Sequence, residues 1–309
     1  MKSFIITVDT EGDNLWAYHK GDSVSTENVK YIPRFQNLCN SYGFKPVWLT
    51  NYEMIMSEEF VRTMKPYVQK GLCEIGIHIH AWNNPPRYDL NGLYDGNPYL
   101  LEYPYEVMRD KFATTYNLIV KCLGVKPVSH RSGRWAMDDR YFKLLEEFGV
   151  IVDCSYTPGV SWLSAKGETV PGGSDYRKVP KGAHLVGNIL ELPATVRRYG
   201  HYVTKGSLKH QLRALIKGGV IWLRPALSPL FEMKKLMKDV DEEQGDDYLE
   251  FMIHSSELMP GGSPYFKDIL SVDKMYETMN QVFTYARELA YEGETLKEYA
   301  IRYNKNYYG

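Results

Sequence analysis

The stretch Phe4-Ile5-Ile6-Thr7-Val8-Asp9-Thr10-Glu11 joins a short apolar, β-branched run to acidic residues at its carboxyl end. Such a run is typical of a buried strand. Similar short runs alternate along the chain with longer segments of helical period, which is the pattern of successive strand–helix units around a parallel sheet. The sequence therefore predicts an α/β fold with about seven strands, arranged as a barrel.

The expected elements follow one another in a regular order. After the first strand, further strands are expected at 46–50, 73–78, just before Arg131, and at 150–153, 187–192 and 248–253. Helices are expected from about Thr26 to Gly43 and from Ser57 to near Gly71, and then at 104–122, 138–148, 207–217, 228–240 and 273–291. No internal repeat or Pro/Gly/Ser-rich linker interrupts this series, so residues 1–309 are expected to form a single barrel domain with a long rim loop at 81–103.

Composition excludes several classes of protein. The chain has 309 residues, 44% of them hydrophobic and 24% charged, which is ordinary for a globular protein with a large core. Its formal net charge of −1 gives no reason to expect a nucleic-acid or anionic-membrane partner. The sequence has no signal-peptide core and no apolar stretch that would span a bilayer, so a cytoplasmic location is expected. An aromatic content of 14% suits a site that stacks on sugars.

Polar residues follow two of the predicted strands where each one ends. Asp9 and Glu11 are two residues apart, as are His78 and His80, and residues at this spacing in a strand point the same way. The carboxyl ends of barrel strands form the rim that carries catalytic residues. Either pair alone has a simpler explanation, a solvated turn or two hydrogen-bonded histidines. Their joint occurrence predicts a divalent metal site, for which zinc fits best and Mn, Co, Ni or Fe use the same ligand types.

Three later residues are expected at the same rim. An arginine there, Arg131, would pair with a carboxylate and lower its pKa. Asp153 either braces Arg131 or opens an Asx turn, and the sequence does not choose between these roles. His254 leaves the last apolar strand and is suited to act as a general acid.

These residues lie within segments that resemble the five ordered motifs of the polysaccharide deacetylase (NodB-homology) family. The resemblance spans Thr7 to Glu257. Trp82 and two further segments are similar to a short branch of the family associated with bacterial cell-wall and lipopolysaccharide sugar biosynthesis. The five motif-like segments are Thr7-Val8-Asp9-Thr10-Glu11-Gly12, Glu74-Ile75-Gly76-Ile77-His78-Ile79-His80, His130-Arg131-Ser132-Gly133-Arg134, Asp153-Cys154-Ser155 and Ile253-His254-Ser255, and the branch-like segments are Trp222-Leu223-Arg224-Pro225 and 255–260.

The resemblance implies a distorted (β/α)7 barrel and metal-dependent hydrolysis of the N-acetyl group of an amino sugar that is free, nucleotide-linked or lipid-linked. By this resemblance Asp9 is the catalytic base, Glu11 the acidic metal ligand and His78 the first histidine ligand. The family's second histidine lies four residues after the first, where this chain has Trp82, so His80 is expected to take that place.

The remaining roles come from the same resemblance. Arg131 steadies the base, Asp153 braces Arg131, and His254 is the general acid. Trp82, Trp135 and Arg134 are expected to contact the substrate, and a backbone N–H near Gly133 or Arg134 to hold the oxyanion.

Two alternatives stay open on the sequence. One is a carbohydrate-binding pseudoenzyme that uses the Tyr-rich and Trp-containing loop at 81–103 without turnover. The other is a hydrolase of a non-sugar amide such as a cyclic ureide, acting with or without a metal.

Overall fold

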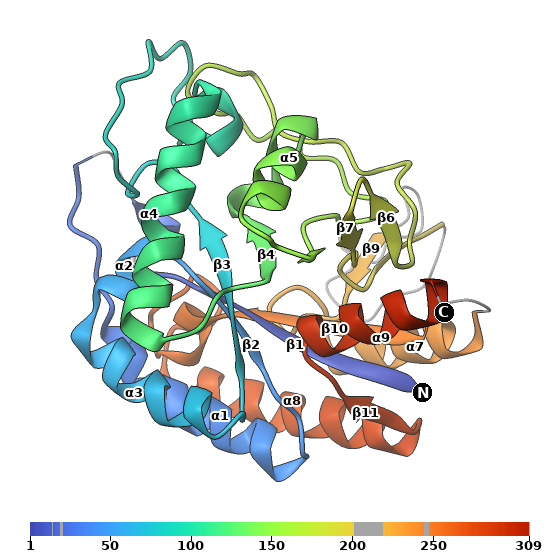
Figure 1. The fold of residues 1–309 in the computed structure, drawn as a ribbon. Helices are drawn as coiled ribbons and strands as arrows, with labels where there is room; N and C mark the ends of the chain where they lie inside the picture. Colours follow the sequence, from blue (N-terminus) through green and yellow to red (C-terminus); the bar gives the residue numbers. More distant parts are fainter. Residues whose placement is uncertain (14, 19–20, 201–218, 244–246, 309) are drawn as a thin grey trace.

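The computed structural model describes residues 1–309 except 14, 19–20, 201–218, 244–246 and 309. Its centre is a curled sheet in the order β10-β1-β2-β3-β4-β5-β7-β6 (Figure 1). Among the described residues, the parallel strands of this sheet are β10 (Tyr248–His254), β1 (Lys2–Thr10), β2 (Val47–Thr50), β3 (Glu74–Ile79), β4 (Ser129–Ser132), β5 (Val152–Asp153) and β7 (Ile189–Glu191). The short strand β6 (His184–Val186) is antiparallel to β7, and β11 (Tyr291–Gly293) pairs with the start of β1.

The barrel is distorted because, within the described part of the chain, no continuous ladder joins β7 to β10. The chain after β7 and the hairpin of β8 (Val196–Tyr199) and β9 (Gly219–Trp222) fill this opening. The Thr195 hydroxyl accepts a hydrogen bond from the Glu250 backbone N–H at 2.8 Å, and the Met252 N–H donates to the Leu223 carbonyl at 3.2 Å. The predicted α/β fold with a distorted barrel is confirmed.

Helices cover the outside of the sheet (Figure 1). They are α1 (Ile32–Ser41), α2 (Tyr52–Met56), α3 (Glu58–Gln69), α4 (Tyr105–Leu123), α5 (Asp139–Glu147), α7 (Leu230–Glu242), α8 (Ile269–Glu288) and α9 (Leu296–Tyr308). Ser57 caps α3 and Asp138 caps α5, each by accepting a backbone N–H three residues ahead. Short 3₁₀ helices occur at Leu15–Ala17, Glu27–Tyr31, Leu100–Glu102, Gly133–Trp135 and Ser255–Leu258.

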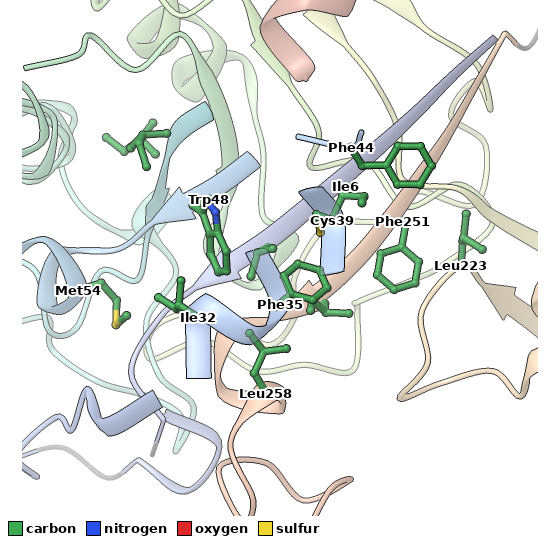
Figure 2. Close-up of a cluster of buried hydrophobic side chains, with 14 of the residues drawn as sticks. Ile6, Ile32, Phe35, Cys39, Phe44, Trp48, Met54, Leu223, Phe251 and Leu258 are labelled. Carbon is green, nitrogen blue, oxygen red and sulfur yellow. The ribbon is translucent and has the colours of Figure 1, made fainter. Parts of the chain in front are cut away.

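The core beneath the site packs α1 against β1, β2 and β10 (Figure 2). Phe35 of α1 meets Trp48 of β2 edge-to-face, with ring centroids 5.9 Å apart. Trp48 is fully buried, and its indole N–H donates to Gln36 Oε1 at 3.0 Å. Close packing of this kind holds the strand ends in fixed positions, which is what a site built on them requires.

Several predicted boundaries were wrong. The helix expected from Thr26 starts as a 3₁₀ helix, and α1 begins only at Ile32, because Pro33 fits the first turn of an α-helix but not its interior. The last predicted helix begins earlier, at Ile269, because Asp268 caps it. Elements α2, α9, β6, β8, β9 and β11 were not predicted. The helix expected at 207–217 lies outside the described residues.

No helix among the described residues is both long enough and apolar enough to cross a bilayer. The carboxyl-terminal helix α9 instead lies against the amino end of β1, where Arg302 donates to the Ser3 hydroxyl at 2.8 Å. This contact is at the opposite end of β1 from Asp9 and Glu11.

Candidate functional site

Strand register brings the predicted residues to one edge of the sheet. Asp9 of β1 lies opposite His254 of β10, and His78 of β3 lies opposite Arg131 of β4. Because parallel neighbours end on the same side, the segments that follow these strands also meet there.

Glu11, His78 and His80 form a buried cluster that is able to hold one metal ion. Glu11 Oε2 is 2.6 Å from His80 Nε2 and 3.7 Å from His78 Nε2, and the two imidazole Nε2 atoms are 3.2 Å apart. Two imidazole nitrogens and a carboxylate oxygen suit zinc and several other divalent ions. His80, which departs from the family's spacing, therefore lies with the other two predicted ligands.

Neighbouring groups hold the His78 ring and the backbone of Glu11 in place. His78 Nδ1 is 2.8 Å from the Arg131 carbonyl oxygen, to which it donates, so its Nε2 lone pair faces the cluster. The backbone N–H of Glu11 donates to the Ser255 hydroxyl oxygen at 3.1 Å. Burial raises the pKa of Glu11, but His80 and His254 beside it hold that pKa well below its usual value. Glu11 is therefore ionised near neutral pH, as a metal ligand must be.

Arg131 is fully buried and joins two carboxylates. It donates to Asp9 Oδ1 at 2.7 Å, to Glu250 Oε1, and through Nε to the Cys154 carbonyl oxygen at 3.1 Å. The Thr7 hydroxyl also donates to Glu250. Burial raises the pKa of Asp9, but Arg131, His78 and His254 outweigh this and leave the pKa below its usual value. Asp9 is thereby kept ionised and aimed at the cluster.

The prediction that Asp153 braces Arg131 was wrong. In the described part of the chain the carboxylate partners of Arg131 are Asp9 and Glu250. Asp153 lies opposite His130 in the strand register, so both side chains point to the other face of the sheet from Arg131. It contacts His130 Nδ1 at 2.6 Å and accepts the Ser155 N–H at 3.2 Å, which is the Asx turn that the sequence left open.

His254 faces the cluster from the other side. Its Nε2 is 3.7 Å from Asp9 Oδ2 and 3.8 Å from Glu11 Oε1. Its Nδ1 is 2.8 Å from a terminal nitrogen of Arg224, which also donates to Glu257 Oε1 at 2.5 Å. Burial raises the pKa of Glu257, but Arg224 outweighs it and brings that pKa to about 2. Glu250, Arg224 and Glu257 were not predicted as site residues, although a lone acid in the apolar strand at 248–253 was a signal for Glu250.

The predicted substrate-contacting residues have different positions. Trp82 is half-buried beside the cluster, with its ring centroid 4.4 Å from that of His80. Trp135 is only 9% exposed and packs over Arg131 and against Trp222, so it belongs mainly to the wall of the site. The Arg134 guanidinium donates to the Asn97 and Lys166 carbonyls and ties the rim loop to a second loop, and its contact with substrate stays a prediction.

Aromatic side chains do flank the cluster, but most come from outside the loop at 81–103. In that loop Tyr99 and Tyr103 are buried. On the His254 side, Trp16 lies 4.9 Å from the imidazole and 5.6 Å from Tyr265, measured between ring centroids. On the His80 side, Tyr18 stacks on Trp82 at 6.2 Å. The segment after β1 thus supplies an aromatic ring to each side, and no motif in the sequence marked it.

Comparison with known proteins gives matches of structure only. No protein-family model matches the chain, and no curated protein matches its sequence. A branching enzyme of Thermococcus kodakaraensis is 13% identical with a TM-score of 0.57, covering 98% of this chain and 71% of that one. A putative polysaccharide deacetylase of Mycobacterium smegmatis is 14% identical with a TM-score of 0.47, covering 96% and 94%. A CE4 family pseudoenzyme of Bacillus anthracis is 11% identical with a TM-score of 0.47, covering 97% and 65%.

These likenesses concern the fold alone. The chain has low-identity structural similarity to polysaccharide deacetylases, to a CE4 family pseudoenzyme and to a branching enzyme.

Proposed function

We propose that this protein is a metal-dependent deacetylase of the polysaccharide deacetylase family, which hydrolyses the N-acetyl group of an amino sugar. The observation that carries the proposal is the buried Glu11–His78–His80 cluster with two further polar groups beside it. Asp9, held by Arg131, and His254 both face this cluster, and their facing atoms are 3.7 Å apart. A metal site flanked by an oriented carboxylate and an imidazole has the parts that amide hydrolysis needs.

Glu11, His78 and His80 would hold the ion, and their mixed nitrogen and oxygen donors favour zinc. A divalent ion in this place supplies Lewis acidity, polarising the amide oxygen and making water more acidic. Asp9 takes the proton from water as oxygen adds to the amide carbon, and Arg131 keeps Asp9 in the ionised form that this requires. Cleavage of the C–N bond, with protonation of the nitrogen, yields acetic acid and the amine.

A sugar substrate is supported by the aromatic rings around the cluster. Trp16 and Tyr265 on one side and Tyr18 and Trp82 on the other provide flat apolar faces next to polar groups. Such rings stack on the apolar face of a pyranose while the polar groups bind its hydroxyls. We therefore propose an N-acetylhexosamine, in cell-wall or lipopolysaccharide biosynthesis, as the substrate class.

Acetate release from N-acetylhexosamine oligomers tests the proposal. Protein freed of metal by a chelator is expected to be inactive, and to regain activity when zinc or another divalent ion is added. A protein that binds the oligomer equally well with Asp9→Asn and never releases acetate would be the pseudoenzyme. Hydrolysis that persists in a His78→Ala, His80→Ala variant would instead indicate a metal-independent amide hydrolase.

A further inference from the structure

Arg224 is a buried guanidinium that contacts a ring nitrogen of His254. It is 5% exposed, and one of its terminal nitrogens is 2.8 Å from His254 Nδ1 and 2.5 Å from Glu257 Oε1. A guanidinium carries only donors and stays protonated in proteins. In this contact His254 Nδ1 must therefore be the acceptor.

The acceptor role of Nδ1 fixes the proton on the other ring nitrogen. A neutral imidazole has one N–H and one lone pair, so His254 carries its proton on Nε2. That atom faces two acceptors, Asp9 Oδ2 at 3.7 Å and Glu11 Oε1 at 3.8 Å. A second proton on Nδ1 would place two donors against each other at the Arg224 contact.

The other groups around His254 keep its imidazole in the orientation that places Nδ1 against Arg224. Glu257 Oε1 is 3.7 Å from Nδ1 but is already paired with Arg224, and its Oε2 accepts the His254 backbone N–H at 3.1 Å. The Trp16 ring contacts the imidazole edge-to-face and is itself held by a hydrogen bond to the Ser256 hydroxyl at 2.9 Å. These contacts restrain the ring on several sides.

We propose that Arg224 is a positioning residue that sets His254 as the neutral Nε2–H tautomer. His254 then acts as a neutral hydrogen-bond donor to the reacting amide, and not as the general acid that the family resemblance implies. This role rests on the proposed deacetylation, whereas the tautomer itself does not.

The proton for the departing nitrogen then comes from Asp9. Water oxygen adds to the amide carbon while one water proton moves to the Asp9 carboxylate. The C–N bond breaks as protonated Asp9 gives that proton to nitrogen, leaving the amine, acetic acid and ionised Asp9. His254 donates its Nε2–H throughout and ends unchanged. Asp9 Oδ2 suits this transfer because it faces the cluster, while Oδ1 is held by Arg131.

Nitrogen NMR of the histidine rings tests the tautomer without any substrate. In protein labelled with ¹⁵N-histidine, with the His254 signals assigned by a His254→Gln variant, we expect a protonated Nε2 and an unprotonated Nδ1. His78 serves as the internal control, because its contact with the Arg131 carbonyl requires a protonated Nδ1. A protonated Nδ1 on His254 at neutral pH in the wild type would overturn the proposal.

Substitutions at residue 224 separate the proposal from a merely structural role. Arg224→Met removes the donor, so the His254 proton is expected to move to Nδ1, whereas Arg224→Lys restores a donor and the Nε2–H pattern. If Arg224→Met fails to fold with Glu257 left unpaired, the Arg224→Met, Glu257→Gln double variant is used instead. An unchanged His254 spectrum in the folded Met variant would refute the role of Arg224.

Kinetic measurements test the proposed role of Arg224 and His254 in the reaction. Acetate release is expected to fall roughly tenfold or more in kcat with Arg224→Met, with KM little changed and with partial recovery in Arg224→Lys. If His254 has the predicted tautomer but the protein releases no acetate, the proposed function is contradicted and the inference about the tautomer is not. A protein that releases acetate but carries a protonated Nδ1 on His254 contradicts the present inference alone.

Discussion

Replacing Gly133 with alanine is expected to weaken metal binding by moving a ligand. A Cβ on residue 133 would lie 2.2 Å from the Ile79 carbonyl oxygen and 2.9 Å from His80 Nδ1. The first distance is more than 1 Å inside the 3.4 Å at which ordinary contact begins, and its partner is backbone. The end of β3 must therefore shift, and His80 follows directly after it.

The size of the effect follows from the tolerance of metal coordination. Metal–ligand distances hold to about ±0.2 Å, so a displacement on the order of 1 Å removes His80 from the ion or strains the site. We expect Gly133→Ala to lower divalent-metal affinity by roughly 10–100-fold, which is about 1.4–2.8 kcal/mol. Competition with a coloured chelator measures this affinity.

Gly200→Ala is the matched control, because a Cβ there meets no atom of the described residues within 4 Å. Both variants are first checked for folding by thermal unfolding. A folded Gly133→Ala protein that binds metal as tightly as the wild type would refute the reasoning that Gly133 sets the position of His80.

Three further predictions concern charge and metal. Glu250→Gln is expected to lower acetate release by roughly tenfold or more while leaving metal affinity nearly unchanged, because Glu250 contacts Arg131 and not the cluster. An equal loss of acetate release in Asp153→Asn, with both variants folded, would argue against Glu250 as the partner that supports Arg131. Burial raises the pKa of Glu53 to about 7. The wild type should therefore lose about 3 kcal/mol of unfolding free energy relative to Glu53→Gln as pH rises from 4.5 to 7. Denaturant titration of the two metal-free proteins measures this difference, and a difference that stays constant with pH would contradict the prediction. Metal at 100 times its Kd should stabilise the wild type by about 2.7 kcal/mol and leave the His78→Ala, His80→Ala variant unchanged, as thermal unfolding with and without a chelator will show.

The order of the strands and the composition of the metal cluster could be predicted from the sequence because both depend on local pattern. Apolar β-branched runs mark the strands, and the two-residue spacing of Asp9 with Glu11 and of His78 with His80 places each pair on one face. The parallel topology then brings the strand ends together.

The pairing of Arg131 with Asp9 follows the expected role of Arg131, but its second partner, Glu250, could not be predicted, because it depends on tertiary register. Asp153 follows Arg131 in a motif-like order, but the pairing of β4 with β5 places it beside His130. Glu250 reaches Arg131 only because β10 lies next to β1 in the curled sheet. Neither fact is encoded in the spacing along the chain.

The aromatic surroundings were missed for a similar reason. The tyrosines of the loop at 81–103 formed the obvious cluster in the sequence, yet that loop packs against residues 165–169 through Tyr99 and Glu102, and Arg134 links the two segments. Trp16 and Tyr265 are far apart in the sequence and meet only beside His254.

Titration of metal-free protein with zinc, followed by acetate release from an N-acetylhexosamine oligomer, decides whether Glu11, His78 and His80 form a catalytic metal site. We expect the rate to rise in proportion to added zinc and to level off at about one ion per chain, as one three-ligand site requires. The His78→Ala, His80→Ala variant should stay inactive at every concentration. Acetate release that is independent of zinc, or equal in the double variant, would contradict the proposed function.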